Sequence, residues 1–382
     1  MAHRKSWLAR QPVKTVYTVC AAVRAIARLS FLSIYYIPHS LRPRKTWTWK
    51  LALGSEATRL SVVYVTAIQL QVPMSLEPGD EGERFVKCSP RADLQAFYSG
   101  ILQSNKNIQP ETLGGTWYPH CYDKDTSNKV VLHFHGGAFV LLDSREEYCG
   151  HGLRTLSEQF DGIPVFCPEY RLATSPTGKW PAPLQDAVTS YLYLLYELNI
   201  DPSRIILSGD SAGGTLALAL LRYIISSQSR VGVNALPLPV AVLLWSPWVN
   251  GHGTDDEANK DNRNKGIDTI GPGFLKWGLQ ELTDNETIIS SSDPYLCPLA
   301  APFKTDSVPL WMQIGTAELF YNPVQKFAKK MRAVGNTVHL YEIPDAVHDP
   351  LISWKLGFQE ELKEGMRQAW DMVNNTTNGR VE

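Results

Sequence analysis

The sequence predicts an α/β fold in which a mostly parallel central sheet is covered by helices on both faces. From residue 129 onward, short runs rich in β-branched and aromatic residues alternate with longer helical stretches, as they do around 129–135 and 163–171. These runs are apolar along nearly their whole length, which indicates strands that are buried on both faces. The 382 residues are 44% hydrophobic, so the chain can bury a core of this size.

The predicted elements follow one another in a regular order after a less regular start. Between residues 38 and 128, prolines and glycines break the chain into short pieces, where we expect further helices and the first antiparallel strands. The predicted strands are 129–135, 163–171, 204–208, 239–248, 309–315 and 337–343, and the predicted helices are 184–198, 215–221, 272–282, 322–334 and 351–374. The polar, proline-rich stretch 250–307 interrupts this order, and an insertion of that length predicts a lid or cap over a pocket.

The composition shows no signature of nucleic-acid binding, of a metal site or of redox chemistry. The net charge is -1, and no basic patch with interleaved aromatic residues stands out beyond the N-terminus, so we expect no nucleic-acid partner. The six cysteines form no C-x-x-C pair, and no histidine lies at the spacing of a zinc ligand. We therefore expect neither a metal nor a cofactor.

The N-terminal segment, 1–38, is basic and largely apolar, and no acidic residue precedes Glu56. Arg24 and Arg28 would each cost about 2.5–3.5 kcal/mol near the centre of a bilayer, so a membrane-spanning helix is disfavoured. Together with Lys14 they fall near one helical stripe, which predicts an amphipathic helix on a membrane surface such as that of the endoplasmic reticulum. Two alternatives are a mitochondrial transit peptide and, in a cytoplasmic protein, a helix packed over the protein's own pocket.

A G-x-S-x-G pattern places one serine at a turn between a strand and a helix. Gly209 and Gly213 flank Ser211, the apolar run 204–208 precedes them, and an Ala/Leu-rich stretch follows. Small neighbours let the backbone make a sharp, strained turn that exposes the serine hydroxyl above the edge of a sheet. Ser211 is therefore the candidate nucleophile, and we interpret its neighbour Asp210 as a structural carboxylate that positions loops.

A second glycine-containing loop follows the strand predicted at 129–135. A glycine pair after a strand lets consecutive backbone N–H groups point at a ligand. If Ser211 attacks a carbonyl group, the oxyanion that forms needs such donors, and losing one raises the barrier by about 3–4 kcal/mol. The expected donors are the amides of Gly136, Gly137 and Ala212.

His348 and Glu318 lie just past the ends of the last two predicted strands, at the sheet edge where Ser211 is expected. A serine hydroxyl needs a neighbouring imidazole to accept its proton, and the imidazole needs a carboxylate that holds its tautomer. The order serine, acid, histidine fits this topology, so His348 is the predicted base and Glu318 the predicted acid. Asp345 and Asp349 are rival acids, but they share a loop with His348 and would reach its far nitrogen with difficulty.

Three motifs resemble the hormone-sensitive-lipase-like branch of the α/β-hydrolase esterases: HGGAF at 135–139, YRLA at 170–173 with PAP at 181–183 and Asp186, and GDSAGG at 209–214. The resemblance runs from about residue 130 to the C-terminus. It implies an α/β-hydrolase domain at 39–382 with a helical cap from about 39–110 and 250–307, and ester hydrolysis without a cofactor. It also implies a triad of Ser211, Glu318 and His348, with oxyanion donors at Gly136, Gly137 and Ala212.

Two residues depart from the usual pattern of this branch. Ala138 replaces the third loop glycine, which is tolerated if its φ is negative, and Glu318 stands where aspartate is commoner. The basic N-terminus is similar to that of fungal members that act on lipophilic acetates, such as steryl esters, or on secondary-metabolite intermediates.

The sequence thus predicts a serine carboxylesterase that hydrolyses a lipophilic ester of short to medium acyl chain through an acyl-enzyme. An acyltransferase or a lactonase could use the same triad, and the sequence does not separate these activities. A ligand receptor on a disabled hydrolase scaffold is a third alternative, against which the presence of His348 argues.

Overall fold

The computed structural model describes residues 6–125, 127–228, 235–251, 260–283 and 293–378, and its centre is an eight-stranded sheet. The strands are β1 (Phe85–Cys88), β2 (Leu113–Tyr118), β3 (Val130–Phe134), β4 (Val165–Glu169), β5 (Ile205–Asp210), β6 (Ala241–Trp245), β7 (Leu310–Gly315) and β8 (Val338–Ile343). Their order across the sheet is β1-β2-β4-β3-β5-β6-β7-β8. Strand β2 pairs antiparallel with both β1 and β4, and all other pairs are parallel, which confirms the predicted, mostly parallel sheet.

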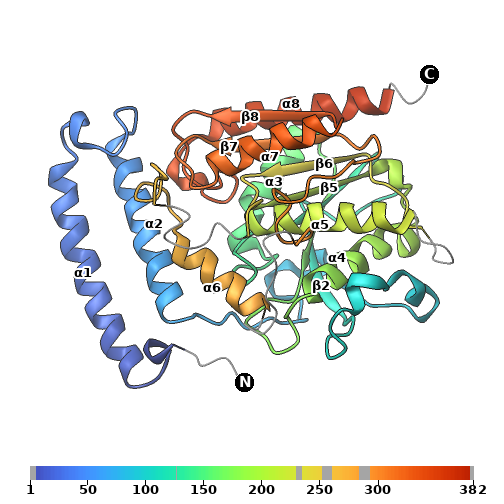
Figure 1. Ribbon diagram of the computed structural model, residues 1–382, viewed down its shortest axis with the longest axis horizontal. Coiled ribbons are helices and arrows are strands. Elements are labelled where there is room, and N and C mark those ends of the chain that lie inside the picture. The colour runs from blue at the N-terminus through green and yellow to red at the C-terminus, as the bar shows by residue number, and fades with distance from the viewer. Residues whose placement is uncertain (1–5, 126, 229–234, 252–259, 284–292, 379–382) are drawn as a thin grey trace.

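Helices cover both faces of this sheet (Figure 1). They are α1 (Val13–Tyr35), α2 (Trp49–Ala67), α3 (His151–Gln159), α4 (Ala182–Leu192), α5 (Ser211–Gln228), α6 (Pro272–Thr283), α7 (Tyr321–Ala333) and α8 (Gln359–Asn378). Neighbouring strand residues point to opposite faces, so Val131 packs with α3 and α8 while Leu132 packs with α4, α5 and α7. The carboxyl ends of the parallel strands therefore meet at one edge, between two helical layers.

Besides α5, which spans Ser211–Gln228 rather than 215–221, two predicted helices differ from the structure by two or more residues. The last one begins at Gln359 rather than at residue 351, because Gly357 with φ 112° and Phe358 with φ 65° turn the chain just before it. The helix predicted at 184–198 begins at Ala182, and its last turn, Tyr193–Glu197, is wound as a π-helix. Neither change moves a predicted site residue.

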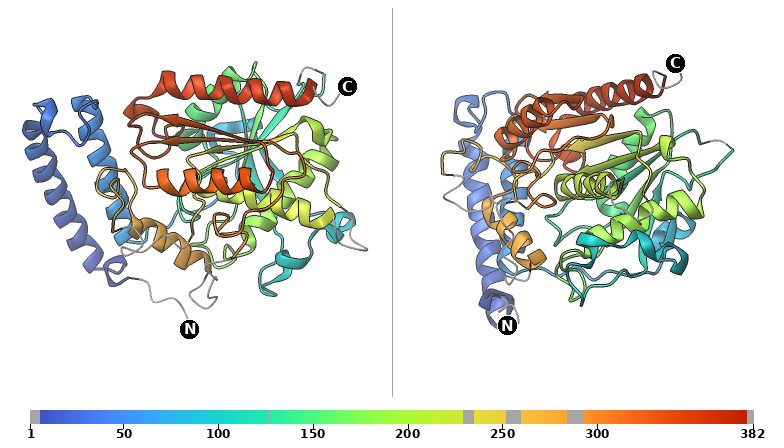
Figure 2. Two further views of the ribbon diagram at one scale, coloured as in Figure 1. Left: turned by 45° about the horizontal axis from the view of Figure 1, so that its top comes forward. Right: turned by 45° about the vertical axis from the view of Figure 1, so that its right-hand side comes forward.

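The N-terminal residues form a helical hairpin beside the sheet domain (Figures 1 and 2). Helices α1 and α2 run antiparallel: Arg28 pairs with Glu56, and the Thr18 and Tyr64 hydroxyls are 2.9 Å apart. Helix α2 lies between α1 and the sheet domain and contacts α6. Two polar residues of α1, Thr18 and Arg28, thus face α2.

By length and composition, α1 could cross a membrane, and it is the single helix of this kind among the described residues. Arg28 of this helix pairs with Glu56 of α2, and the expectation that Arg24 and Arg28 disfavour a membrane span stays a prediction. The predicted cap range 39–110 also overlaps the sheet, because it includes β1. Of the predicted cap 250–307, residues 252–259 and 284–292 lie outside the described residues.

Candidate active site

Ser211 sits at the predicted sharp turn between β5 and α5. Its φ is 48°, in the left-handed region that residues with side chains rarely adopt, so this turn is strained as expected. Glycine is required on both sides. A Cβ at Gly209 would lie 2.3 Å from the carbonyl oxygen of Gly213, and a Cβ at Gly213 would lie 1.8 Å from that of Phe134. The turn therefore holds Ser211 in one position at the carboxyl edge of the sheet.

The structure brings Ser211, His348 and Glu318 together in one hydrogen-bonded chain. His348 Nε2 lies 3.0 Å from Ser211 Oγ, and His348 Nδ1 lies 3.0 Å from Glu318 Oε2. An ionised carboxylate only accepts hydrogen bonds, so Nδ1 carries the proton and Nε2 is left to accept one from the serine hydroxyl. The rival acid Asp345 is turned away, toward Arg44.

Glu318 is fully buried and accepts two further hydrogen bonds. Ser246 Oγ donates to Oε1 at 2.7 Å, and the Gly315 N–H donates to the same oxygen at 2.6 Å. Burial raises the pKa of Glu318 well above its usual value, and these two donors act against that rise. Sequence reasoning missed Ser246, whose only signal is a serine directly after a buried strand.

The loop after β3 differs from its prediction in one way. Gly136 packs against Asp210, where a Cβ would lie 2.3 Å from Oδ2, so this position requires glycine. Ala138 has φ 53°, although a negative value was the condition for tolerating alanine there. Gly137 has φ 96°, and a Cβ there would lie 2.1 Å from the carbonyl oxygen of Leu141, so only glycine fits.

Buried polar side chains contact the end of β3 and the loop that follows it. The His135 ring stacks on Tyr170 with centroids 4.3 Å apart, and the Tyr170 hydroxyl donates to the His135 carbonyl oxygen at 2.8 Å. Asp210 Oδ1 lies 3.0 Å from His133 Nε2. Burial raises the pKa of Asp210 to about 6 and lowers the pKa of His133 to about 3. Asp210 thus contacts a buried histidine below the loop, as expected for the structural carboxylate that the sequence predicts.

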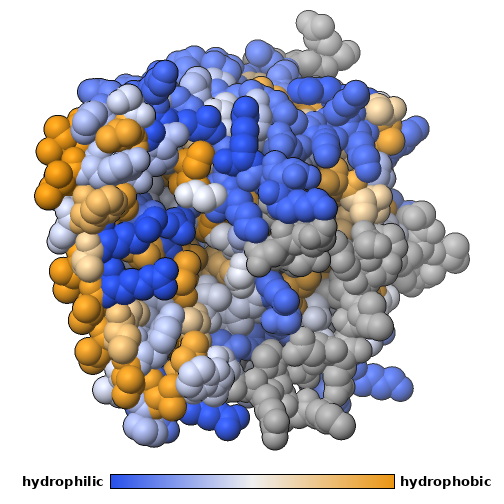
Figure 3. Space-filling view, turned by 60° about the vertical axis from the view of Figure 1, so that its left-hand side comes forward, coloured by the Kyte–Doolittle hydropathy of each residue, from blue (hydrophilic) through white to orange (hydrophobic). Residues whose placement is uncertain are grey.

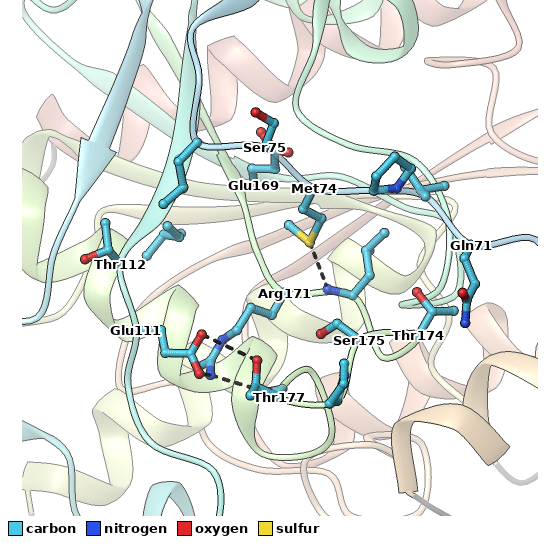
Figure 4. A pocket seen from close by; sticks show the side chains of 17 residues that line it. Gln71, Met74, Ser75, Glu111, Thr112, Glu169, Arg171, Thr174, Ser175 and Thr177 are labelled. Atoms are coloured by element: carbon cyan, nitrogen blue, oxygen red, sulfur yellow. Dashed lines mark hydrogen bonds and ion pairs between the residues drawn. The ribbon is translucent and has the colours of Figure 1, made fainter.

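A cavity of about 530 Å³ is lined by neither Ser211 nor its two partners (Figure 4). The segment 71–76 forms part of its lining, and in Figure 4 the side chain of Glu111 is bonded to Thr177. Glu169 lines it as well and is almost fully buried beside Arg145, 3.1 Å away. The lining shares no residue with the hydrogen-bonded chain, so the cavity is separate from it.

No cluster of three or more His, Cys, Asp or Glu side chains that could hold a metal ion occurs in the part of the chain that the structure describes. The six cysteines are unpaired, and four of them are buried.

Residues 131–352 match a protein family described as alpha/beta hydrolase fold, and this range is more than half of the chain. The chain belongs to this α/β-hydrolase family. The match begins in β3 and ends after the loop that carries His348, so it includes every residue of the hydrogen-bonded chain.

Curated relatives of this α/β-hydrolase are ester hydrolases. The ethyl acetate hydrolase of Pseudomonas putida is 26% identical over 257 residues, which cover 64% of this chain and 72% of the relative. The acetyl-hydrolase of Streptomyces hygroscopicus is 28% identical and covers 58% of this chain and 67% of its own length. The mouse (Mus musculus) neutral cholesterol ester hydrolase 1 is 32% identical over 120 residues, 29% of each chain.

Solved structures agree on the fold. A mutant of the esterase E40 superposes with a TM-score of 0.57 at 21% identity and covers 91% of this chain and 98% of its own. A hormone-sensitive lipase from a metagenome library gives a TM-score of 0.56 at 20% identity and covers 69% and 82%. Together with the family match and the curated relatives, these neighbours identify a hormone-sensitive-lipase-like esterase that hydrolyses carboxylic esters.

Proposed function

We propose that this esterase hydrolyses a lipophilic ester of short to medium acyl chain through an acyl-enzyme on Ser211. The observation that carries the proposal is the chain of two 3.0 Å contacts from Ser211 through His348 to Glu318. A serine, a base and an acid in this geometry form the arrangement that activates a hydroxyl nucleophile at neutral pH. His348 is itself largely buried, so bulk water has little access to the base.

In the proposed mechanism, Ser211 Oγ attacks the ester carbonyl carbon while His348 Nε2 takes the hydroxyl proton. The C–O bond to the alcohol then breaks, and His348 gives the proton to the departing alkoxide. Water repeats the sequence on the acyl-enzyme, and the acid and free Ser211 are released. Glu318 stabilises the imidazolium that forms in each half reaction.

The oxyanion of each tetrahedral intermediate needs donors that are not already engaged. We assign this role to the amides of Gly136 and Gly137 in the loop after β3. The amide of Ala212, directly after the nucleophile, completes the set. The left-handed φ values of Gly137 and Ala138 distinguish this part of the loop from extended backbone.

The lipophilic character of the substrate is supported by helix α1, which presents an apolar face to the outside. The exposed residues of this face are Val16, Val19, Val23, Ile26, Phe31 and Ile34, between 58% and 72% exposed. Figure 3, which brings the hairpin side forward, shows apolar side chains running along this side of the molecule. We propose that this face contacts a membrane, where a poorly soluble ester accumulates. The basic segment before Glu56 is complementary to anionic lipid.

The names of the relatives support the two halves of the proposed substrate. Ethyl acetate hydrolase and acetyl-hydrolase indicate a short acyl group, and neutral cholesterol ester hydrolase indicates a bulky apolar alcohol. A lipophilic acetate combines both features.

The test is hydrolysis of p-nitrophenyl esters from acetate to palmitate by the intact protein, by Ser211→Ala and by the control Ser203→Ala, a serine in the turn before β5. We expect activity that is highest at short chains, is lost in Ser211→Ala by at least about a thousandfold, and is kept in the control. Full activity in Ser211→Ala contradicts the mechanism. Ester products formed when an alcohol is added would instead favour acyl transfer.

A further inference from the structure

The segment 262–268 forms hydrogen bonds with both loops that carry the triad residues Glu318 and His348. Asp268, fully buried, accepts a hydrogen bond on Oδ1 from the His348 backbone N–H at 2.8 Å. It accepts another on Oδ2 from the Leu319 N–H at 2.6 Å. One carboxylate therefore joins the residue after the triad acid to the backbone of the triad base.

The neighbouring asparagines hold the other side of the acid loop. Asn264 Nδ2 donates to the carbonyl oxygens of Thr316 and Glu318, at 3.0 and 2.8 Å, and Asn262 Nδ2 donates to the carbonyl oxygen of Leu319 at 2.9 Å. In the loop that carries Glu318, one backbone N–H thus donates to the Asp268 carboxylate, and three backbone carbonyl oxygens accept from the side-chain amides of Asn262 and Asn264. The position of this loop depends on residues 262–268, which are about 50 positions away in the sequence.

The base of the N-terminal hairpin supports the same loops from outside. Arg44 Nη2 donates to Asn264 Oδ1 at 2.7 Å, and Trp47 Nε1 donates to the carbonyl oxygen of Asp345 at 2.8 Å. The apolar cluster at this contact contains Leu32, Tyr36, Trp47, Leu51, Ala52, Ala317 and Val347. Its last two members directly precede Glu318 and His348, so the hairpin packs against the backbone of both triad loops.

We propose that Asp268 is a positioning residue of this esterase, and that the hairpin base, through Trp47, holds the same two loops in place. The inference rests on the proposed function of Ser211, His348 and Glu318. Strands β7 and β8 are paired, but both triad residues lie beyond the last pair of that ladder, Gly315 with Ile343. Beyond that pair, the Ala317 N–H donates to the Ala346 carbonyl oxygen at 3.0 Å. Asp268 adds contacts to Leu319 and His348 themselves, and these hold the distance between His348 and Glu318.

The buried charge of Asp268 has a second consequence for His348. Burial raises the pKa of Asp268 to about 6, and the charge of His348 acts against this rise, so the two groups interact electrostatically. An ionised Asp268 therefore helps Glu318 to stabilise the imidazolium that forms during the reaction. Asp349 faces His348 in the same way, and burial raises the pKa of that carboxyl well above its usual value.

The first test is Asp268→Asn, in which one of the two accepting oxygens becomes an amide group that cannot accept. Either the His348 or the Leu319 N–H then loses its partner, while the volume of the side chain is kept. We expect kcat on p-nitrophenyl acetate to fall about 10- to 100-fold, since misplacement by an ångström costs on that order. KM should stay within about twofold, because Asp268 does not contact substrate, and labelling of Ser211 by a fluorophosphonate should slow in parallel with kcat. An unchanged kcat would overturn the proposal.

A second pair of variants keeps the proposal testable if Asp268→Asn fails to fold. Trp47→Phe removes the donor to Asp345 but keeps an aromatic ring, and we expect kcat to fall about three- to tenfold, the range of one net hydrogen bond. Tyr64→Phe is the control, since it removes a hydrogen bond to Thr18 elsewhere in the hairpin and should leave kcat unchanged. An equal fall of kcat in both variants would show that the hairpin acts only through overall stability and would overturn its proposed role.

These results are distinguishable from failure of the proposed function. If Ser211→Ala keeps full activity, the mechanism itself is wrong. If Ser211→Ala is inactive while folded Asp268→Asn and Trp47→Phe keep the wild-type kcat, only the positioning role is wrong. Melting temperatures of all four variants establish which of them are folded.

Discussion

The catalytic edge of the sheet buries charged side chains, whereas the outer face of α1 exposes apolar ones. Both arrangements are the opposite of what is usual in a folded protein. At the catalytic edge, Glu318 and Asp210 are fully buried and Asp349 is 5% exposed. On α1, Val23 is 62% exposed and Ile34 is 72% exposed, with no segment of the described chain over them. Carboxylates are thus shielded from water at the catalytic edge, and aliphatic side chains are exposed to water on α1.

Neither arrangement stabilises the fold. Burial of a carboxylate carries a penalty of several kcal/mol that partners only partly offset. Each exposed aliphatic side chain forgoes about 1.5–3 kcal/mol of burial. The partners of the buried carboxylates are the elements of the active site, and the natural partner of an uncovered apolar face is lipid or protein. The buried carboxylates therefore indicate the catalytic site, and the exposed apolar face of α1 indicates a binding surface.

The backbone differs between the two regions in the same sense. Ser211, Ala138, Phe139, Ser246 and Asp349 all have φ between 45° and 63°, and all belong to the loops around the catalytic chain. Helix α1 is a regular helix in which no described residue has positive φ. Strained residues thus occur in the loops where catalytic groups are held and are absent from the described part of α1.

The strongest test of the catalytic edge is Glu318→Gln, which keeps the shape of the acid but removes its charge. If that charge serves His348, kcat/KM on p-nitrophenyl acetate should fall by about 10³–10⁴, because the wrong tautomer of His348 is then favoured. The control is Asp345→Asn, the rival acid in the same loop as His348, which should lose less than about tenfold. Similar losses in the two variants would show that Glu318 is not the acid.

The outer face of α1 is tested by replacing Val19, Val23 and Ile26 together with glutamine, a good helix former. We expect binding to vesicles of phosphatidylcholine and phosphatidylserine to weaken about a hundredfold, since three apolar side chains no longer enter the interface. Hydrolysis of the water-soluble p-nitrophenyl acetate should not change. Flotation of the protein with the vesicles measures the first quantity.

The control for this variant replaces Tyr148 and Tyr196, two exposed apolar residues outside the hairpin, with glutamine. This protein should bind vesicles as the wild type does. If wild type and triple variant bind equally, or if the triple variant forms a smaller oligomer than the wild type in solution, the face contacts protein rather than lipid.

Sequence patterns predicted the parts of the site that depend on local structure. Ser211 was found because a strand, two glycines and a helix define its turn within a few residues. His348 and Glu318 were found because they follow strands that end at the same edge. Ser246 and Asp268 were missed because their contacts to the His348 loop span 103 and 80 residues, and no local pattern specifies such pairs.

The same limit applies to α1 and to the loop after β3. Periodicity indicated which residues of α1 share a stripe. It could not identify the ion-pair partner of Arg28, because that partner, Glu56, belongs to α2. The glycine pair indicated an oxyanion loop, but it did not show that Gly136 packs against Asp210, 74 positions later in the sequence, where a Cβ would lie 2.3 Å from Oδ2. Residue roles that depend on neighbours in the sequence were predictable, whereas contacts between residues far apart in the sequence were not.

A smaller effect is expected at Glu169, a buried carboxylate outside the catalytic chain. Burial raises the pKa of Glu169 to about 7, despite its contact with Arg145. Between the unfolded value near 4.5 and this folded value, the folded state binds more protons than the unfolded state, so this group's contribution to stability falls as pH rises. Above pH 7 the loss is complete, at roughly 2–3 kcal/mol.

Glu169→Gln isolates this contribution. Urea unfolding of both proteins at pH 5 and pH 8 should show the variant gaining roughly 2 kcal/mol on the wild type between the two pH values. Arg145 keeps its hydrogen bonds to Glu81 and to backbone carbonyls, so the variant does not leave it unpaired. A difference that is independent of pH would show that Glu169 is ionised throughout this range.

The smallest effect compares one substitution, alanine to glycine, in the two regions. In the middle of α1, Ala27→Gly should lower helix stability by about 1 kcal/mol, because glycine loses more backbone entropy on folding. At Ala138, relief of the left-handed φ, worth about 1–2 kcal/mol, is opposed by the extra entropy of the unfolded chain and by the loss of a buried methyl group. The net change in the free energy of unfolding should be close to zero, and activity should be kept. A loss at position 138 as large as that at position 27 would mean that Ala138 is not strained, and that the catalytic edge differs from α1 in its buried charge alone.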